Sequence, residues 1–155
     1  TARRWGVWNL YNRQPITLKV TSTAGYAISA TQALRYINAQ SSHAALSFCG
    51  LPEEPIEIIY SQAAAVTVNN GTASYSVAIG IDAVSASGKL GNLSITNPAA
   101  SNLVIAPDLV ASHEIAPDLG GHNIYCLEQA TLAASCSVTL SGTENSRQML
   151  VRYRG

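Results

Sequence analysis

Residues 56–81 read IEIIYSQAAAVTVNNGTASYSVAIGI. The first run, Ile56 to Val68, opens with alternating isoleucine and polar residues, and Asn69-Asn70-Gly71 follows it. In the second run, Ser74 to Ile81, every second residue from Tyr75 onward is large and apolar. Such alternation is typical of half-buried strands, and Asn and Gly supply the left-handed conformers of a tight turn. The stretch therefore predicts a β-hairpin.

The same period of two recurs along most of the chain. Residues 16–21 alternate aliphatic residues with Thr and Lys, and further strands are expected at 8–12, 44–48, 103–112, 123–129, 136–140 and 148–153. Helix-like windows at 30–39 and 63–65 are too short to outweigh them, and the Ser- and Gly-rich residues 85–100 predict a long surface loop. The pattern predicts one all-β domain over residues 1–155, a jelly-roll-like antiparallel β-sandwich of about 8–10 strands. Residues 1–7 are expected to form an extended arm or linker.

The composition is rich in apolar residues and poor in charge. Hydrophobic residues make up 47% of the 155 residues and charged ones 12%, with nine basic residues balancing nine acidic ones. The high apolar content argues against disorder, and the balance of charge argues against nucleic-acid binding. The sequence has no run of about 20 apolar residues, so membrane insertion is not expected. A surface short of charge is expected to be covered by other copies of the chain. The start, with Arg3 and Arg4 before Trp5, is unlike a signal peptide, and Thr1 suits either a trimmed initiator Met or a piece of a longer chain.

Cysteine spacing supports neither a disulfide framework nor a metal site. The chain has three cysteines, Cys49, Cys126 and Cys136, and this odd number argues against purely intramolecular pairing. Cys126 and Cys136 could face each other across a hairpin, but two half-buried thiols are the preferred interpretation. Because there is no Cys-x-x-Cys pair, structural zinc is not expected, and the chain is predicted to use no metal and no cofactor.

Polar residues of catalytic type are densest between His113 and Glu128. His122 and Glu128, six positions apart on an expected strand, would face the same side about 20 Å from each other. No His-x-His, His-Glu-x-x-His or Gly-x-Ser-x-Gly pattern is present. We therefore expect structural histidines and no catalytic residues. A depolymerase that uses His113, Glu114, Asp118 or His122 is one alternative.

The pentapeptide IAPDL occurs twice, at residues 105–109 and 115–119. The first copy leads into the apolar residues of an expected strand, whereas in the second copy Asp118 and Leu119 are followed by Gly120, a turn sequence. The two copies are therefore expected in different backbone settings. A site built from Asp108 and Asp118 as paired carboxylates has weak support.

Aromatic and basic residues gather near the N-terminus. Trp5, Trp8 and Tyr11 lie close to Arg13 in the sequence. Aromatic rings can stack on sugars, and Trp, Tyr and Arg are also favoured in subunit interfaces. We prefer the interface, and glycan contact by Trp5, Trp8, Tyr11 and Arg13 remains an alternative.

Several segments resemble a family of β-rich virion proteins of tailed bacteriophages and prophages. Residues 8–15 (WNLYNRQP) are similar to the family's Trp-x-Val-Tyr-Asn-Arg-x-Pro strand, and residues 50–54 (GLPEE) to its Gly-Leu-x-Glu-Asp/Glu turn. Residues 77–82 (VAIGID) resemble its Val-Gly-Ile-Gly-Leu-Asp strand end. Residues 120–128 (GGHNIYCLE) follow its Gly-x-His-x-Leu-x-Trp-x-Glu strand, with cysteine in place of Trp, and a terminal glycine also matches.

This resemblance implies a structural role without enzymatic activity. The family's members look like fibre, spike or head-decoration components, which implies a homotrimer that contacts other virion proteins and host-surface polysaccharide. The chain is then expected in the virion, after assembly in the bacterial cytoplasm. The matching residues Gly120, Gly121, His122 and Glu128 are expected to form a structural turn-and-strand motif. A carbohydrate-binding module that uses exposed aromatic residues is the alternative function.

Overall fold

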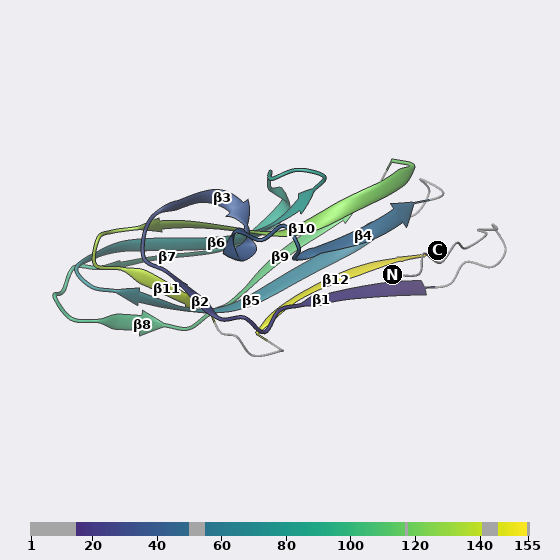
Figure 1. Cartoon of the computed structure of the whole chain (residues 1–155). Helices are drawn as coiled ribbons and strands as arrows, with labels where there is room; N and C mark the ends of the chain where they lie inside the picture. The colour runs from purple at the N-terminus through teal and green to yellow at the C-terminus, as the bar shows by residue number, and fades with distance from the viewer. Residues whose placement is uncertain (1–14, 50–54, 117, 141–145, 155) are drawn as a thin grey trace.

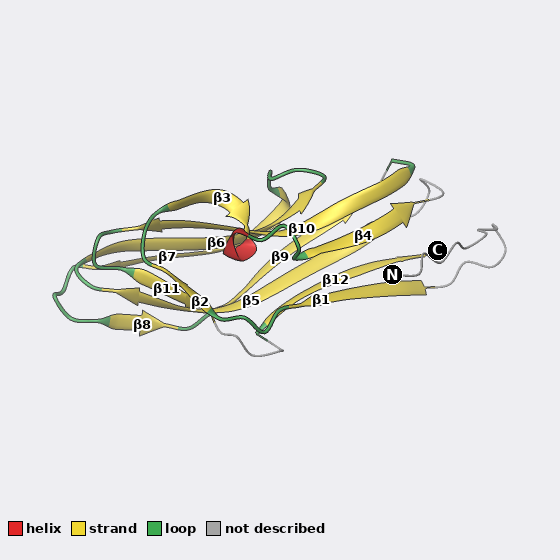
Figure 2. Ribbon diagram, viewed as in Figure 1, coloured by secondary structure: helices red, strands yellow, loops and turns green. Residues whose placement is uncertain are grey.

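The computed structural model describes residues 15–49, 55–116, 118–140 and 146–154. These residues form twelve strands and one short 3-10 turn, and strands make up most of the described chain (Figure 2). The strands are β1 (Pro15–Thr21), β2 (Tyr26–Ile28), β3 (Gln32–Tyr36), β4 (Ala44–Cys49), β5 (Ile56–Val68), β6 (Gly71–Ile81), β7 (Ser87–Asn97), β8 (Leu103–Ile105), β9 (Asp108–Ile115), β10 (Gly120–Leu132), β11 (Ser137–Leu140) and β12 (Arg147–Arg154), and the 3-10 turn η1 is Ile37–Ala39. The prediction of an all-β fold is confirmed.

Several of these strands are halves of longer ones. β8 and β9 pair with β5 in a single register, because Ile105 lies opposite Val66 and Asp108 opposite Ala63. β11 and β12 follow one another along the other side of β5, and β2 and β1 lie in the same way beside them. β3 and β4 together line one side of β10. Counted in this way, the described residues form eight long strands.

These eight strands make two four-stranded antiparallel sheets (Figure 1). Sheet one has the order β1/β2, β12/β11, β5, β9/β8, and sheet two has the order β3/β4, β10, β6, β7. Numbered along the chain, the long strands thus run 1-8-3-6 in one sheet and 2-7-4-5 in the other. This alternation between sheets is the double Greek key of a jelly roll. A single register pair, Lys89 with Ser112, joins β7 to β9 and connects the two sheets at one edge.

The core lies between the sheets and follows the period of two. In β5 every even-numbered residue from Ile56 to Val68 is buried, and the odd-numbered ones face outward. β6 and β10 supply the opposing layer, with Tyr75, Val77 and Ile79 completely buried. Burial of the alternating apolar face against a second sheet is what makes each sheet stable.

The turn at residues 69–71 does not close a hairpin. Asn70 has the expected left-handed backbone, with φ 46°, but β5 pairs with β8, β9, β11 and β12, and β6 with β7 and β10. Both strands have a strongly apolar face, so they pack face to face in opposite sheets instead of edge to edge. The turn therefore crosses between the layers. Gly71 permits this crossing, since a Cβ there would lie 2.7 Å from the Cβ of Ala133.

Two other predictions need correction. Residues 85–100 contain β7, which pairs with β6 along most of its length, so the prediction of a long loop is wrong. The Gly-rich composition of this segment wrongly suggested a loop, because Gly91 is needed for close packing within a strand. A Cβ at Gly91 would lie 2.7 Å from the backbone nitrogen of Val110. The strand expected at 103–112 is interrupted at residues 106–107 but keeps its register. The expected strand at 8–12 and the expected arm at 1–7 lie outside the described residues.

Two cysteines in the described ranges are free thiols. Cys126 and Cys136 are both buried, deeper than expected, and they do not pair with each other. Burial raises the pKa of Cys126 to about 12, so its thiol stays protonated and packs as an apolar group. Its Sγ lies 3.7 Å from the Sδ of Met149. Within the described part of the chain, no helix has the length and apolar character needed to cross a membrane.

Candidate functional site

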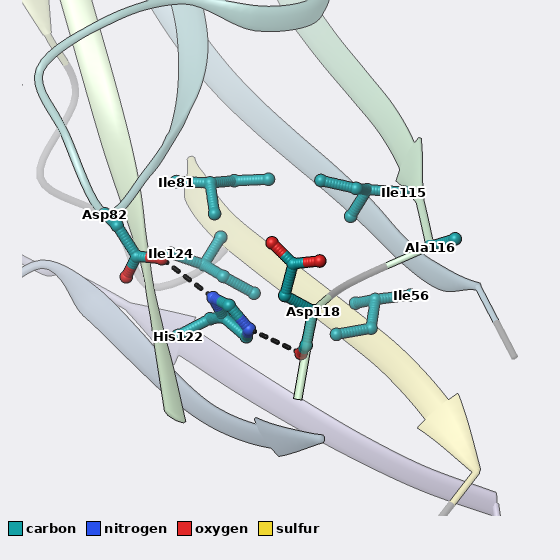
Figure 3. Close-up of a pocket in the computed structure, with 8 residues that line it drawn as sticks. All are labelled: Ile56, Ile81, Asp82, Ile115, Ala116, Asp118, His122 and Ile124. Carbon is teal, nitrogen blue, oxygen red and sulfur yellow. Dashed lines mark hydrogen bonds and ion pairs between the residues drawn. The ribbon is translucent and has the colours of Figure 1, made fainter. Parts of the chain in front are cut away.

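A pocket opens between the two sheets at one end of the sandwich (Figure 3). It forms where β5 and β10 begin and where β6 and β9 end, and it encloses about 150 Å³. Register pairs bring its apolar walls together, Ile56 with Ile115 in one sheet and Ile81 with Ile124 in the other. Its lining comprises Ile56, Ile81, Asp82, Ile115, Ala116, Asp118, His122 and Ile124. The pocket is thus an apolar space with three titratable side chains at its edge.

His122, on β10, makes hydrogen bonds through both of its ring nitrogens, one to the loop after β6 and one to the loop after β9. Nδ1 lies 2.7 Å from Oδ2 of Asp82, and Nε2 lies 2.8 Å from the backbone carbonyl oxygen of Asp118. The other carboxylate oxygen of Asp82 accepts a hydrogen bond of 2.8 Å from the backbone N–H of Asn123. When the ring is protonated, both nitrogens donate, so this arrangement favours the imidazolium form.

The pKa values of the pair shift as this geometry requires. The hydrogen bond to Asp82, together with that to the Asp118 carbonyl, raises the pKa of His122. The hydrogen bond from His122, together with that from the Asn123 backbone, lowers the pKa of Asp82. The Asp82 side chain is half exposed, so solvent weakens this ion pair compared with a buried one.

The pH dependence of stability should report this pair. His122→Gln is expected to lower the free energy of unfolding by about 0.5–1 kcal/mol at pH 6, because the partly exposed ion pair is lost. Since the pKa of His122 is raised in the folded protein, this contribution is complete below about pH 6.5 and declines as the pH rises through the raised value. Urea unfolding of both proteins between pH 5 and 9 measures it. A wild-type advantage that grows toward pH 9 would contradict this origin.

The carboxylate of Asp118 has a different setting from that of Asp82. Figure 3 shows it directed into the pocket, between Ile81 and Ile115, while the backbone carbonyl of the same residue meets His122. It makes no hydrogen bond or ion pair with any described residue. Asp118 is solvent-exposed, and its charge also contributes to raising the pKa of His122.

The structure places the residues considered for catalysis in two different parts of the molecule. The described lining of the pocket contains no serine, threonine or cysteine that could act as nucleophile. His113 and Glu114 lie on β9 outside the lining, with Glu114 exposed and His113 beside Gly88. No group of three or more His, Cys, Asp and Glu residues suited to a metal ion occurs among the residues that the structure places. Among the residues considered for catalysis, the structure brings Asp118 and His122 together, and their contact is the hydrogen bond between the His122 ring and the backbone carbonyl of Asp118.

The doubled pentapeptide occupies two separate places. Asp108 begins β9 opposite Ala63, whereas Asp118 follows the end of β9, where Ile115 lies opposite Ile56. Seven residues of β5 separate these two positions, which corresponds to about 23 Å. The two aspartates therefore do not form a paired-carboxylate site.

A second polar cluster lies inside the core and surrounds Glu128. This side chain is fully buried, and its Oε1 lies 3.0 Å from both Nε and Nη2 of Arg35. The backbone N–H of Asn38 donates a hydrogen bond of 3.0 Å to the same oxygen, and the hydroxyls of Tyr26 and Tyr75 donate to Oε2. Every oxygen of the carboxylate is thus hydrogen-bonded, as a buried charge requires.

Arg147 continues this cluster into the opposite sheet. It is 2% exposed, its Nε donates to Oε1 of Gln62 at 2.7 Å, and its Nη1 donates to Oγ of Ser22 at 3.0 Å. Its guanidinium carbon lies 5.1 Å from the ring centre of Tyr26, whose hydroxyl reaches Glu128. Burial is also the main reason why the pKa of Tyr26 is raised. This chain of contacts joins sheet one to sheet two through the core.

The predicted motif residues on β10 fall into these two sites. Gly120, Gly121, His122 and Glu128 all lie in β10, and the last two face the interior with Ile124 and Cys126 between them. Gly120 has φ 127°, a conformation that favours glycine, at the point where the chain enters the strand. The predicted contact residues Trp5, Trp8, Tyr11 and Arg13 lie outside the described residues.

Sequence reasoning did not find Arg147, Gln62, Asp82 and Tyr26. Gln62 carried a usable signal, because it occupies an inward position in the alternating pattern of β5, where a polar residue needs a buried partner. A scan against protein-family models, a search of curated proteins and a search of solved structures each returned no match for this chain.

Proposed function

We propose that this chain is a non-enzymatic structural subunit of a bacteriophage virion, a fibre, spike or head-decoration component that assembles as a homotrimer. The observation that carries the proposal is the exposed apolar surface of β8 and the first half of β9. Leu103, Val104 and Ile105 are 39%, 58% and 37% exposed, and Val110 is 48% exposed. These four residues lie along one strand line, here called the β8 edge. Val104 and Val110 lie opposite outward-facing residues of β5, and Leu103 and Ile105 lie opposite inward-facing ones.

The β8 edge is unusual for a chain that stays monomeric. β8 pairs with β5 on one side, and no described strand pairs with its other side. Three consecutive exposed aliphatic residues on a strand with one unpaired edge favour association, and soluble monomers normally protect such edges with charge, proline or a covering loop. Docking with further copies removes both the apolar surface and the unpaired backbone groups from water.

Two further features support a particle subunit. Jelly rolls are a common architecture of viral capsid and lectin domains, although the fold alone specifies no function. The segments that resemble phage virion proteins include residues 77–82 and 120–128, which the structure places as neighbouring strands β6 and β10. In the proposed role the subunit contacts other virion proteins and, at the particle surface, host polysaccharide.

The β8 edge can be tested in solution. Wild-type protein is expected to run as a homotrimer at micromolar concentration, and Val104→Lys to run as a monomer, because lysine on an edge strand opposes pairing. Light scattering coupled to size exclusion measures both masses. Val84→Lys, at a 40% exposed valine in the β6–β7 connection, is the matched control and should remain trimeric. A wild-type monomer, or equal dissociation of both variants, would contradict the assignment.

The particle assignment needs its own experiment. Particles released from a culture that carries the gene should contain the chain in fixed stoichiometry, and gold-labelled antibody should mark one position on each particle. Absence of the chain from purified particles would rule out the virion role and leave the oligomer result standing.

A further inference from the structure

The ring of His122 lies between two groups that can only accept hydrogen bonds. Nδ1 is 2.7 Å from Oδ2 of Asp82, and Nε2 is 2.8 Å from the backbone carbonyl oxygen of Asp118. A protonated imidazole donates from both nitrogens, whereas a neutral one donates from one nitrogen and presents a lone pair at the other. Both contacts can therefore persist only while the ring is protonated.

The contact with Asp82 is the one that a neutral ring can keep. Its acceptor is a carboxylate, and hydrogen bonds to an ionised group are roughly twice as strong as those between neutral groups. The other oxygen of this carboxylate accepts a hydrogen bond of 2.8 Å from the backbone N–H of Asn123, which holds the carboxylate beside the ring. A neutral His122 is thus expected to carry its hydrogen on Nδ1. The lone pair of Nε2 would then meet the Asp118 carbonyl oxygen, and two acceptors at that distance repel each other.

The surroundings of the ring contain no other cation. Asp82 and Asp118 are the charged residues of the described pocket lining, and the remaining contacts from β5 and β9 are Ile56 and Ile115. No lysine or arginine occurs in that lining, so the proton of His122 is its one positive charge. Loss of this proton therefore changes the balance of the pocket more than any other single titration near neutral pH.

A hydroxyl donor without an acceptor lies on the neighbouring strand. Ser47 of β4 is directly opposite His122 of β10, and it faces the interior, since it is completely buried whereas Leu46 is 67% exposed. Its Oγ makes no hydrogen bond with the described residues, which is unusual for a buried hydroxyl. Side chains directly opposite on one face of an antiparallel pair have Cβ atoms about 4.5–5.5 Å apart. A change in the orientation of the His122 ring can therefore bring Nε2 to Ser47.

We propose that loss of the proton from His122 moves Nε2 from the Asp118 carbonyl to the Ser47 hydroxyl, while Nδ1 continues to donate to Asp82. The ring then has a hydrogen-bonded partner for each nitrogen in both states. In the protonated state it holds the Asp118 end of the pocket to β10, and in the neutral state it releases that end. Since the pKa of His122 is raised, the change occurs above about pH 6.5. The switch does not depend on the proposed virion role, because every group belongs to one chain.

Nitrogen-15 NMR of the full-length chain between pH 5 and 9 tests the switch. Neutral His122 is expected as the Nδ1–H tautomer, and its ring signals are identified by their loss in His122→Gln. The backbone amide of Leu119, which follows the Asp118 carbonyl, should shift with the same midpoint as the ring. That shift should be absent in His122→Gln.

Ser47→Ala tests the second partner. It removes a contact of the neutral ring alone, so it should raise the pKa of His122 by about 0.7, the effect of one lost hydrogen bond. Ser76→Ala is the matched control, because Ser76 lies on β6, the other neighbour of β10, opposite the outward-facing Gln129. It should leave the pKa of His122 unchanged.

Three results would each overturn the proposal. A neutral ring that carries its hydrogen on Nε2 would keep the Asp118 contact and lose the one to Asp82. A Leu119 amide that does not follow the ring between pH 5 and 9 would show that the Asp118 carbonyl is not released. A pKa of His122 that is unchanged in Ser47→Ala, or raised equally in Ser76→Ala, would show that the Ser47 hydroxyl does not bind the neutral ring.

Discussion

Glu128→Ala is expected to lower the free energy of unfolding by about 3–5 kcal/mol, the usual result of removing one partner from a buried ion pair. The side chain is completely buried, and its two oxygens accept hydrogen bonds from Arg35, Asn38, Tyr26 and Tyr75. The variant leaves several of these donors without an acceptor inside the core. A cavity adds to the loss, because the surrounding sheets cannot collapse onto the deleted atoms.

Urea unfolding at pH 7 measures this effect, and three variants separate its causes. Glu128→Gln keeps the shape and one acceptor oxygen, so its loss should be smaller than that of alanine. Arg35→Ala should also be strongly destabilising, because it leaves the fully buried Glu128 carboxylate without its cation. Gln129→Ala, at the next residue of β10 and exposed, should change stability by less than about 0.5 kcal/mol. An effect of Glu128→Ala no larger than that of Gln129→Ala would refute the structural role of the cluster.

The sequence predicted most of the strands because burial of one face produces an alternation of apolar and polar residues that is visible within each strand. β5, β6 and β10 show their alternation without knowledge of partners, since each has one face in the core. The choice of partner strand produces no comparable pattern in the sequence of a strand. The residues of β5 and β6 look the same whether the strands lie edge to edge or face to face, so the turn at 69–71 was read as a hairpin.

The candidate sites were less predictable because their partners are distant in the sequence. His122 and Asp82 are 40 residues apart, and Arg147 and Ser22 are 125 apart. Neither contact follows from spacing, and each depends on the jelly-roll order that brings the strands together. The residues of β10 could be singled out from the sequence, but their partners could not.

The two polar sites have opposite characters, and this difference bears on function. In the cluster around Glu128 and Arg147 both of these side chains are buried and the contacts join the sheets, so the cluster is suited to specifying one packing of the core. The pocket lined by Asp118 and His122 is open at one end of the sandwich, so another group can enter it. A subunit that must assemble reproducibly needs both a rigid body and surfaces left for partners.

Arg147→Ala is expected to cost about 3–5 kcal/mol of unfolding free energy, mainly through the cavity that it leaves in the core. Arg147 is among the largest fully buried side chains of the described residues. Its charge has no carboxylate in direct contact: the guanidinium bonds to Gln62 and Ser22 and lies over the Tyr26 ring, and its Nη2 makes no hydrogen bond to the described residues. A cation buried in this way contributes little net stability of its own, because its desolvation offsets its contacts.

Arg147→Met should therefore be much less harmful than Arg147→Ala, with a loss of about 1–2 kcal/mol, because methionine fills most of the volume without a charge to desolvate. Gln62 would keep its hydrogen bonds to Tyr60 and to the Ser146 carbonyl. Arg152→Met is the matched control on the same strand, and it should cost less than about 1 kcal/mol because Arg152 forms an exposed ion pair with Glu57. Urea unfolding of the three variants gives the order. If methionine were as harmful as alanine at position 147, the guanidinium contacts and not the filled volume would hold the two sheets together, and the cluster would owe its stability to its charges.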